Sequence, residues 1–192
     1  GCAIYYRDPT LAHGESTLDW GYGTGERWYL EYIAVLIKKI LDSLGIALSD
    51  TLFFGASGGG FMSILLAAML RGRATAINPH LALAHVWPTQ LERFRASVLK
   101  PGEALLPHRT RALSLIERED FFPPLQIVQN RTDSWGISRQ LTPFLAELPG
   151  LDASPGKNLR VQFYDIGGGC GALPPKEDCL ALMAQALARR EP

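Results

Sequence analysis

The stretch from 51 to 70 limits what this chain can fold into more than any other part of the sequence. A short apolar run at 52–54 precedes Gly55-Ala56-Ser57-Gly58-Gly59, and an almost wholly apolar run follows at 61–70. This order predicts a buried strand, a tight turn with Ser57 at its tip, and a buried helix. A serine held there has a strained backbone, and glycines two residues before and after it are expected to prevent collisions between strand and helix. The pattern is typical of a turn that presents a serine nucleophile.

The start of the predicted helix also places positive electrostatic potential beside Ser57. Backbone N–H groups in a first helical turn have no helical acceptor, and they stabilise negative charge that develops near them. We expect the Gly58 N–H to form one half of an oxyanion hole and the glycine-rich loop 20–25 to supply the other half. The alternative interpretation is a turn that serves only the packing of helix on strand, because a fold can keep such a turn without its chemistry.

Other glycine-rich motifs are disfavoured by the residues around this turn. A dinucleotide-binding fingerprint requires glycine at position 61, where Phe61 stands, and an acidic residue about 20 positions later. The chain has no Tyr-x-x-x-Lys pair and no Gly-Lys-Ser/Thr, which argues against a short-chain dehydrogenase and a P-loop. No spacing of cysteine and histidine resembles a zinc site. The sequence therefore predicts neither a cofactor nor a metal.

Composition narrows the class of protein. With 192 residues, of which 47% are hydrophobic, the chain can form one globular domain with a sizeable core. Nineteen basic side chains balance nineteen acidic ones, which favours neither nucleic acid nor an acidic membrane surface as a partner. No apolar run reaches the roughly 18 residues of a membrane span. The odd cysteine count (Cys2, Cys170, Cys179) suits a reducing, cytoplasmic compartment. Because the chain begins at Gly1, we expect a fragment of something longer.

Runs that predict strands alternate with segments that predict helices. The strands are expected at 2–6, 52–54, 74–78, 124–130 and 159–166, and the helices at 26–44, 61–70, 137–148 and 176–190. Such alternation predicts an α/β fold in which a mostly parallel sheet carries helices on both faces. The segment 81–122, with helical stretches at 90–99 and 110–118, is expected to be a cap-like insertion within a single domain that spans 1–192.

The clearest amphipathic pattern lies at 26–44. Its apolar residues recur at steps of three and four and predict one buried face, made of Tyr29, Tyr32, Ile33, Leu36, Ile37, Ile40, Leu41 and Leu44. Gly45 follows as a natural C-cap, because glycine adopts the left-handed conformation that ends many helices at little cost. This segment is therefore expected to lay one continuous stripe on the core.

Three strand ends carry residues suited to a common site. Active sites in parallel sheets lie at the carboxyl ends of the strands. Ser57, Asp133 and the loop around Cys170 each follow a predicted strand, in the order in which serine, aspartate and histidine occur in a hydrolase triad. We expect the Asp133 carboxylate to point into the loop 167–171 and to accept hydrogen bonds from its N–H groups or from the Ser134 hydroxyl, because a buried carboxylate without donors is costly.

Seven short motifs occur in register along nearly the whole chain. They are Asp8-Pro9-Thr10-Leu11, Trp20-Gly21-Tyr22-Gly23-Thr24, Gly55-Ala56-Ser57-Gly58-Gly59-Gly60-Phe61, Asn78-Pro79, Gln129-Asn130-x-x-Asp133, Thr142-Pro143-Phe144 and Pro174-Pro175-Lys176-Glu177. As a set they resemble α/β-hydrolase-like proteins found with bacterial cell-surface polysaccharide and glycosyltransferase systems, to which the accessory-Sec acetyltransferase of streptococci is related. The resemblance implies an esterase-like or O-acyltransferase-like domain that acts on acyl groups of glycans or glycoproteins. Its implied partners are an acylated small molecule or glycan and a glycosyltransferase domain.

The chain departs from that family near its C-terminus. The family pattern is Gly-His followed shortly by Pro-Pro-Lys, whereas here Cys170 stands at the histidine position. The four histidines of the chain (His13, His80, His85 and His108) all precede the last predicted strand.

Two hypotheses about function follow from this departure. In the first, Ser57 is the nucleophile of a degraded triad, Asp133 orients a base, and His80 is the alternative base because it follows the strand 74–78. In the second, the domain is a catalytically inactive binding or scaffolding module.

Overall fold

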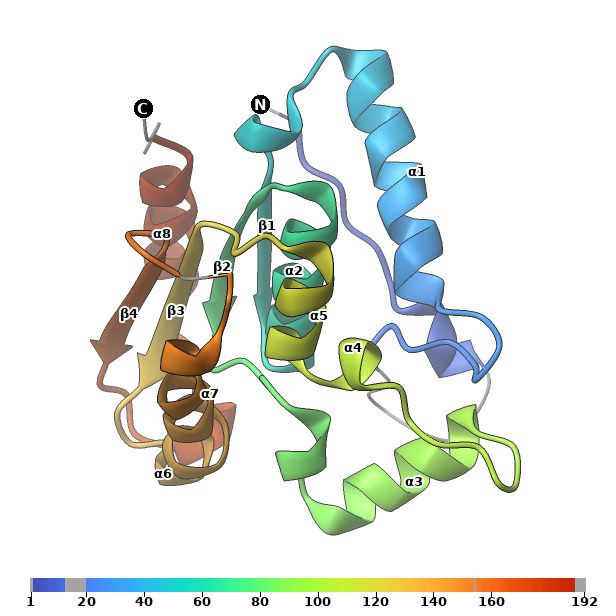
Figure 1. Ribbon diagram of the computed structural model, residues 1–192. Coiled ribbons are helices and arrows are strands. Elements are labelled where there is room, and N and C mark those ends of the chain that lie inside the picture. The colour runs from blue at the N-terminus through green and yellow to red at the C-terminus, as the bar shows by residue number, and fades with distance from the viewer. Residues whose placement is uncertain (1, 13–19, 154, 189–192) are drawn as a thin grey trace.

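A computed structural model of the chain describes residues 2–12, 20–153 and 155–188. Its centre is a sheet made of β1 (Leu52–Ala56), β2 (Arg73–Ile77), β3 (Leu125–Asn130) and β4 (Leu159–Tyr164). These strands lie side by side in the order β1-β2-β3-β4, as Figure 1 shows. The pairings of β1 with β2, β2 with β3 and β3 with β4 are all parallel. The predicted parallel sheet is confirmed.

Helices cover both faces of this sheet. The described α-helices are α1 (Tyr29–Leu44), α2 (Gly58–Leu70), α3 (Pro88–Val98), α4 (Pro107–Thr110), α5 (Ala112–Glu119), α6 (Ser134–Gly136), α7 (Thr142–Glu147) and α8 (Lys176–Ala188). On one face α2 packs against β1 and β2 and contacts α1 and α5. α8 lies on the other face (Figure 1). Its Leu182 packs against Ile77 and Val128 of the sheet. The helices thus enclose the strands whose carboxyl ends carry the predicted site.

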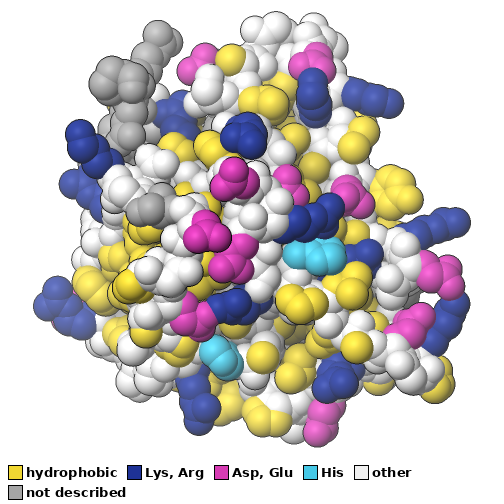
Figure 2. All heavy atoms as spheres, viewed as in Figure 1, with side chains coloured by type: hydrophobic (Ala, Val, Ile, Leu, Met, Phe, Trp, Pro, Cys, Tyr) yellow, Lys and Arg dark blue, Asp and Glu magenta, His cyan; other side chains and the backbone are white. Residues whose placement is uncertain are grey.

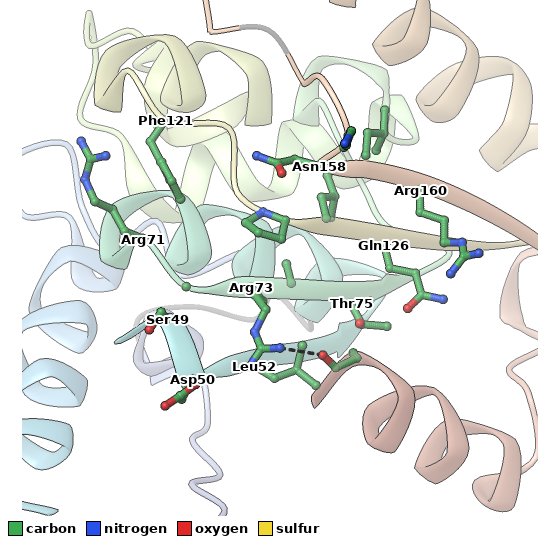
Figure 3. Close-up of a pocket in the computed structure, with 17 residues that line it drawn as sticks. Ser49, Asp50, Leu52, Arg71, Arg73, Thr75, Phe121, Gln126, Asn158 and Arg160 are labelled. Atoms are coloured by element: carbon green, nitrogen blue, oxygen red, sulfur yellow. Dashed lines mark hydrogen bonds between the residues drawn. The ribbon is translucent and has the colours of Figure 1, made fainter. Parts of the chain in front are cut away.

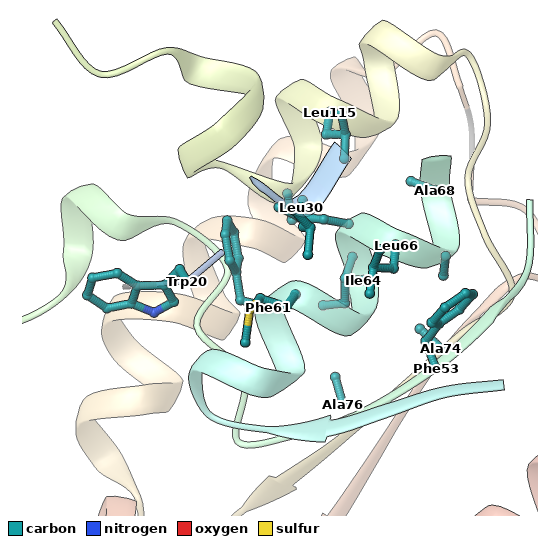
Figure 4. Close-up of a cluster of buried hydrophobic side chains, with 14 of the residues drawn as sticks. Trp20, Leu30, Phe53, Phe61, Ile64, Leu66, Ala68, Ala74, Ala76 and Leu115 are labelled. Carbon is teal, nitrogen blue, oxygen red and sulfur yellow. The ribbon is translucent and has the colours of Figure 1, made fainter. Parts of the chain in front are cut away.

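The core is centred on α2. This helix is apolar around its whole circumference, and Phe61, Ile64 and Leu65 have no exposed surface. Figure 4 shows Phe61 and Ile64 between Leu30 of α1, Leu115 of α5 and the sheet. Burial of each large apolar side chain contributes about 1.5–3 kcal/mol, so the helix that follows Ser57 is held firmly against the sheet.

The segment 81–122 combines two kinds of structure. Its predicted helical stretches correspond to α3 and α5, which are joined by a connection that contains the short α4. α5 belongs to the helical layer beside α2, whereas α3 lies beyond the carboxyl ends of the strands (Figure 1). Phe94 of α3 is fully buried, and its ring meets Trp20 edge-on at 4.9 Å between centroids. The part around α3 is therefore the part of the insertion that lies at the edge where a cap is expected.

The strand predicted at 2–6 is wrong. Residues 2–7 form no strand in the described structure, and the Tyr5 side chain is 91% exposed. A run of β-forming residues becomes a strand only when a neighbour takes up its N–H and C=O groups, and the described part of the chain offers this run none. Side-chain contacts hold this segment instead: the Tyr6 hydroxyl donates to Met62 Sδ, and the Asp8 carboxylate accepts hydrogen bonds from the N–H groups of Thr10 and Gly21.

The helix predicted at 26–44 begins three residues later, at Tyr29, and its predicted buried face is partly wrong. Gly45 ends it in the left-handed conformation as expected, with φ 65°. The buried positions are Leu30, Ala34, Ile37 and Leu41, whereas the predicted face included Tyr32, Leu36 and Leu44, which are 62%, 58% and 52% exposed. Apolar residues occupy more than one side of this helix. Periodicity alone therefore could not decide which stripe faces α2.

The molecular surface carries charges of both signs. Figure 2 shows lysine and arginine side chains interspersed with aspartate and glutamate on the face that it presents. Mixed charge of this kind agrees with the balanced composition and gives no single-sign field on that face. Within the described residues, no helix combines the length and apolarity that crossing a bilayer requires.

Candidate active site

Ser57 occupies the sharp turn between β1 and α2. Its backbone has φ 52° and ψ −119°, a conformation that L-residues rarely adopt. The Ser57 N–H donates to the Ile77 carbonyl at 2.9 Å, and the Ser57 carbonyl accepts from the N–H groups of Phe61 at 3.1 Å and His80 at 3.2 Å. These bonds tie the turn to the end of β2 and to the first turn of α2. The strained geometry is thereby imposed by its surroundings.

The two glycines that flank Ser57 play different roles. A Cβ added at Gly55 would collide with the carbonyl group of Gly59 and would lie 2.8 Å from Ser63 Oγ. A Cβ added at Gly59 would meet nothing within 4 Å. The expectation that both glycines prevent collisions is therefore correct for Gly55 and wrong for Gly59. The strand approaches α2 closely on the side of residue 55, while residue 59 has open space.

Relief of the strain at Ser57 should stabilise the fold. We expect Ser57→Gly to raise the free energy of unfolding by about 1 kcal/mol, because glycine removes the positive-φ strain but has more backbone entropy to lose on folding. Ser57→Ala keeps a Cβ in the same conformation, so its stability should lie within about 0.5 kcal/mol of the parent. Urea unfolding of the three proteins measures both effects. If the glycine variant were less stable than the alanine variant, the backbone at residue 57 would not be strained.

Most of the N–H groups that were expected to complete an oxyanion hole beside Gly58 already have acceptors. Gly58 is the first residue of α2, where backbone N–H groups have no helical acceptor. In the loop 20–25, the N–H of Gly21 donates to Asp8 Oδ2 at 2.7 Å, and that of Gly23 donates to Thr10 Oγ1 at 2.9 Å. The N–H groups of the two residues after Gly23 donate to backbone carbonyls at 2.9 and 3.1 Å. These four groups hold the loop and are not available to a substrate.

His80 lies beside the Ser57 turn at the end of β2, as the sequence predicted. Its side chain is 9% exposed. Trp20 Nε1–H donates to His80 Nδ1 at 2.8 Å, and the imidazole lies 6.3 Å from the Trp135 ring, centroid to centroid. Burial lowers the pKa of His80 to about 4, while the Asp133 carboxylate acts in the opposite direction. The imidazole is therefore uncharged at neutral pH.

Asp133 follows β3 and is 4% exposed. Its Oδ1 accepts from the Gly136 N–H at 2.8 Å, and its Oδ2 accepts from Gln129 Nε2 at 3.2 Å. The donors that we expected, the N–H groups of 167–171 and the Ser134 hydroxyl, do not bind it among the described contacts. The expectation was wrong because Asp133 caps α6 and turns back onto its own strand end. A side chain at position 136 would collide with Oδ2, so the cap depends on Gly136.

The loop that carries Cys170 is anchored by two asparagines. Its backbone forms a short 3₁₀ turn, Gly169–Gly171, next to α6. Asn130 Nδ2 donates to the carbonyls of Ile166 and Gly169, and Asn78 Nδ2 donates to the Ala172 carbonyl. Sequence reasoning missed this function of Asn78 and Asn130. A buried amide at the end of each of two central strands was the available signal, since such a group needs specific partners.

The predicted residues lie at one edge of the sheet but do not form a hydrogen-bonded triad. Ser57, His80, Asp133 and the Cys170 loop follow β1, β2, β3 and β4, whose parallel pairing brings their ends together. Within the described residues, no hydrogen bond links the Ser57 hydroxyl to an imidazole. The other described histidines lie elsewhere: His85 lines a small cavity near Gln140, and His108 packs on Trp28. His13 is outside the described residues.

A large cavity lies away from this site. It has a volume of about 910 Å³ and lies at the amino ends of the strands, where Arg73, Gln126 and Asn158 line it (Figure 3). Ser57 is at the opposite ends of the same strands. Among the described residues, no group of three acidic, histidine or cysteine side chains could hold a metal ion.

Comparisons with known proteins identify the fold. No family model matches the sequence, and no curated protein matches it either. Among solved structures, S-formylglutathione hydrolase from Agrobacterium tumefaciens matches with a TM-score of 0.62 at 21% identity, over 88% of this chain and 62% of that one. An esterase from Pyrobaculum calidifontis matches with a TM-score of 0.55 at 18% identity, over 83% and 59% of the two chains.

The capsule O-acetyltransferase of Neisseria meningitidis serogroup A also matches, with a TM-score of 0.54 at 16% identity over 89% of this chain and 69% of that one. The present chain spans about three fifths of the length of the hydrolase and of the esterase. At these identities the likeness shows the fold, which is an α/β-hydrolase fold. Proteins that share it include esterases and an acetyltransferase.

Proposed function

We propose that this chain carries a serine acyl-transfer site of the esterase or O-acyltransferase class, with Ser57 as the nucleophile. The observation that carries the proposal is the strained conformation of Ser57, φ 52° and ψ −119°, at the carboxyl edge of a parallel sheet. A turn that only packs a helix on a strand has no need of a serine there, because glycine would adopt the conformation without strain. Strain of this kind concentrates at functional sites.

The proposed step is attack of Ser57 Oγ on an acyl carbonyl carbon. The new C–O bond forms as the carbonyl π electrons move to oxygen, and the Gly58 N–H stabilises the resulting oxyanion. In the absence of a side-chain base, the hydroxyl proton passes to solvent water. The intermediate collapses as its leaving oxygen takes a proton from water, so that the alcohol departs and an acyl-serine remains. Water or a sugar hydroxyl then takes the acyl group. With Cys170 at the family's histidine position, the proton has no base at its usual place, so turnover should be slow.

The proposed substrates are O-acylated glycans or glycoproteins. Two observations support this choice: the seven motifs resemble α/β-hydrolase-like proteins of cell-surface polysaccharide systems, and a capsule O-acetyltransferase shares the fold. In such a system, a glycosyltransferase domain is the proposed partner, and the odd cysteine count favours the cytoplasm as the compartment. The segment 81–122, whose α3 lies at the same edge as Ser57, is the proposed cap over the acceptor.

A fluorophosphonate probe tests the proposal directly. We expect the probe to modify Ser57 covalently, because phosphorylation of the hydroxyl uses the same nucleophile and the same oxyanion donor as acyl transfer. Mass spectrometry of the intact protein and of its peptides measures the extent and the place of modification. Ser57→Ala should remain unmodified, and Ser63→Ala, which changes a buried serine of α2, should label like the parent. Modification that is absent, or that persists in Ser57→Ala, would refute a nucleophilic Ser57.

A non-catalytic module is the second candidate, and one observation favours it. Ser57 has no described imidazole within hydrogen-bonding distance, and the family's histidine is replaced by Cys170. In this alternative the α/β-hydrolase fold is kept for binding a glycan or a partner enzyme. The same probe decides between the two candidates, because a binding module leaves Ser57 unmodified even at high probe concentration.

A further inference from the structure

We propose that His80 acts at the Ser57 site as a neutral hydrogen-bond donor through Nε2–H, and that Trp20 is the positioning residue that holds it in this state. The catalytic part of this inference rests on the proposed acyl-transfer function. The protonation state of His80 does not depend on that function, because it follows from the contacts of the ring. The two parts can therefore be tested separately.

The contact with Trp20 determines which nitrogen of His80 carries the proton. An indole N–H is a donor only, and here it points at His80 Nδ1 across 2.8 Å in a buried setting. Nδ1 must therefore accept and cannot carry a hydrogen. A neutral imidazole has one N–H, which leaves the proton on Nε2. Trp20 itself is fully buried and packed edge-on against Phe94, so the donor is held in place.

A second proton on His80 would be costly. The imidazolium form would carry a hydrogen on Nδ1, which would break the bond from Trp20 and leave a buried indole N–H without an acceptor. It would also place a charge on a side chain that is 9% exposed. The groups that face the ring are Trp20, Trp135 and the Asp133 carboxylate, and of these only Asp133 favours the charged form. His80 therefore stays neutral above about pH 5, in agreement with its lowered pKa.

This state excludes His80 from the function of general base that the sequence suggested. A base must accept the Ser57 proton on a nitrogen with a free lone pair. Nε2 already carries a hydrogen, and the lone pair of Nδ1 is occupied by Trp20. What His80 can offer is a hydrogen-bond donor whose position is fixed before a substrate arrives.

The chain around His80 is held in a fixed position beside the Ser57 turn. His80 is joined to Ser57 through its backbone N–H at 3.2 Å, and the next two residues are held by Gln140 Oε1, which accepts from their N–H groups at 2.8 and 3.0 Å. Nε2 is on the side of the ring away from Trp20, and it has no hydrogen-bond partner in the described part of the chain. Among the described contacts, the Asp133 carboxylate accepts from Gln129 Nε2 and the Gly136 N–H, and not from His80. Nε2–H is thus left to donate to an oxygen of a ligand, which is the role that the proposal gives it.

Long-range ¹H–¹⁵N NMR of the histidine ring tests the protonation state. We expect a bare Nδ1 and a protonated Nε2 in His80, with no titration between about pH 5.5 and pH 9. Trp20→Phe should release Nδ1, so that the two neutral forms mix and the titration midpoint rises. Trp28→Phe, which changes a buried tryptophan that packs on His108, is the control and should leave the His80 signals unchanged. A protonated Nδ1, or titration of the parent near pH 6.5, would overturn the inference.

The rate of Ser57 modification by the fluorophosphonate probe tests the catalytic part. His80→Gln keeps an N–H donor and an oxygen that can accept from Trp20. His80→Leu keeps a side chain of similar size but has neither a donor nor an acceptor. We expect the leucine variant to lose about 10²–10³-fold in rate, as when one oxyanion donor is removed, and the glutamine variant to lose less than about tenfold.

Equal losses, with a parent rate that depends on a group titrating near pH 6.5, would identify a base and overturn the donor role. Unchanged rates in both would also overturn it. An unmodified Ser57 in every protein would refute the proposed function, and the NMR result would still decide the protonation state.

Discussion

Replacing Cys170 with histidine is expected to raise the turnover of p-nitrophenyl acetate by at least about 100-fold. A serine hydroxyl needs a nearby base as it attacks, and imidazole, with a pKa of about 6.5, is largely neutral and available at pH 7. A thiol is mostly protonated at that pH and has a single sulfur, so it cannot bind an aspartate on one side and a serine on the other. In the state that we propose for His80, the ring has no free lone pair, so it does not supply the missing base.

The neighbourhood of the Cys170 loop supports this gain. α6, which Asp133 caps, contacts the turn Gly169–Gly171. The Asp133 carboxylate accepts two hydrogen bonds and has further lone pairs for an imidazole N–H. Cys170→Phe is the matched control, since it adds a ring of similar size without a base and should show no gain. Ser57→Ala in the histidine variant should abolish the gain. A folded Cys170→His protein with the parent's turnover would contradict the triad assignment.

Gly55→Ala is expected to lower the free energy of unfolding by about 3 kcal/mol. The new Cβ would collide with the Gly59 carbonyl, which is backbone in the first turn of α2 and cannot rotate away as a side chain would. Overpacking of this kind costs about 1–3 kcal/mol, and a backbone obstacle places it at the upper end of that range. The helix would have to shift away from β1, so modification of Ser57 by the fluorophosphonate probe should fall as well.

Gly59→Ala is the matched control for that experiment. Nothing lies within 4 Å of the position that its Cβ would occupy, and alanine is favoured over glycine in a helix by up to about 1 kcal/mol. We therefore expect this variant to be as stable as the parent or slightly more stable. Urea unfolding monitored by tryptophan fluorescence compares the two proteins. Equal effects of the two substitutions would contradict the close approach of strand and helix at residue 55.

The parts of the fold that the sequence could predict are those that depend on neighbours along the chain. The turn at Ser57 is specified within a dozen residues, by a strand, a glycine and an apolar helix, so its pattern was sufficient. The parallel sheet followed from the alternation of strands and helices. The strand expected at 2–6 failed because β-structure needs a partner strand, and the sequence of a run says nothing about whether one lies beside it.

The details of the candidate site depended on contacts between distant residues. Trp20 and His80 are 60 positions apart, and no local pattern predicts that an indole would occupy one imidazole nitrogen. The position of His80 at the edge could be inferred from the strand before it, whereas the hydrogen bond that fixes its protonation could not. Asp133 is different, because a carboxylate followed three residues later by Gly136 is a local capping pattern that could have been recognised.

The hydrogen bonds of Asn78 make the ends of three strands mechanically dependent on one another. Its Oδ1 accepts from the Asn130 N–H at 2.7 Å, while its Nδ2 donates to Tyr164 Oη at 2.7 Å and to the Ala172 carbonyl at 3.2 Å. One amide thus links β2 to the end of β3, to β4 and to the loop beyond Cys170. Any ligand or substitution that displaces this loop must stretch bonds that also position the strand leading to His80. The hydrogen bonds of Asn78 therefore limit how far the Cys170 loop can move to accommodate a ligand or a larger side chain.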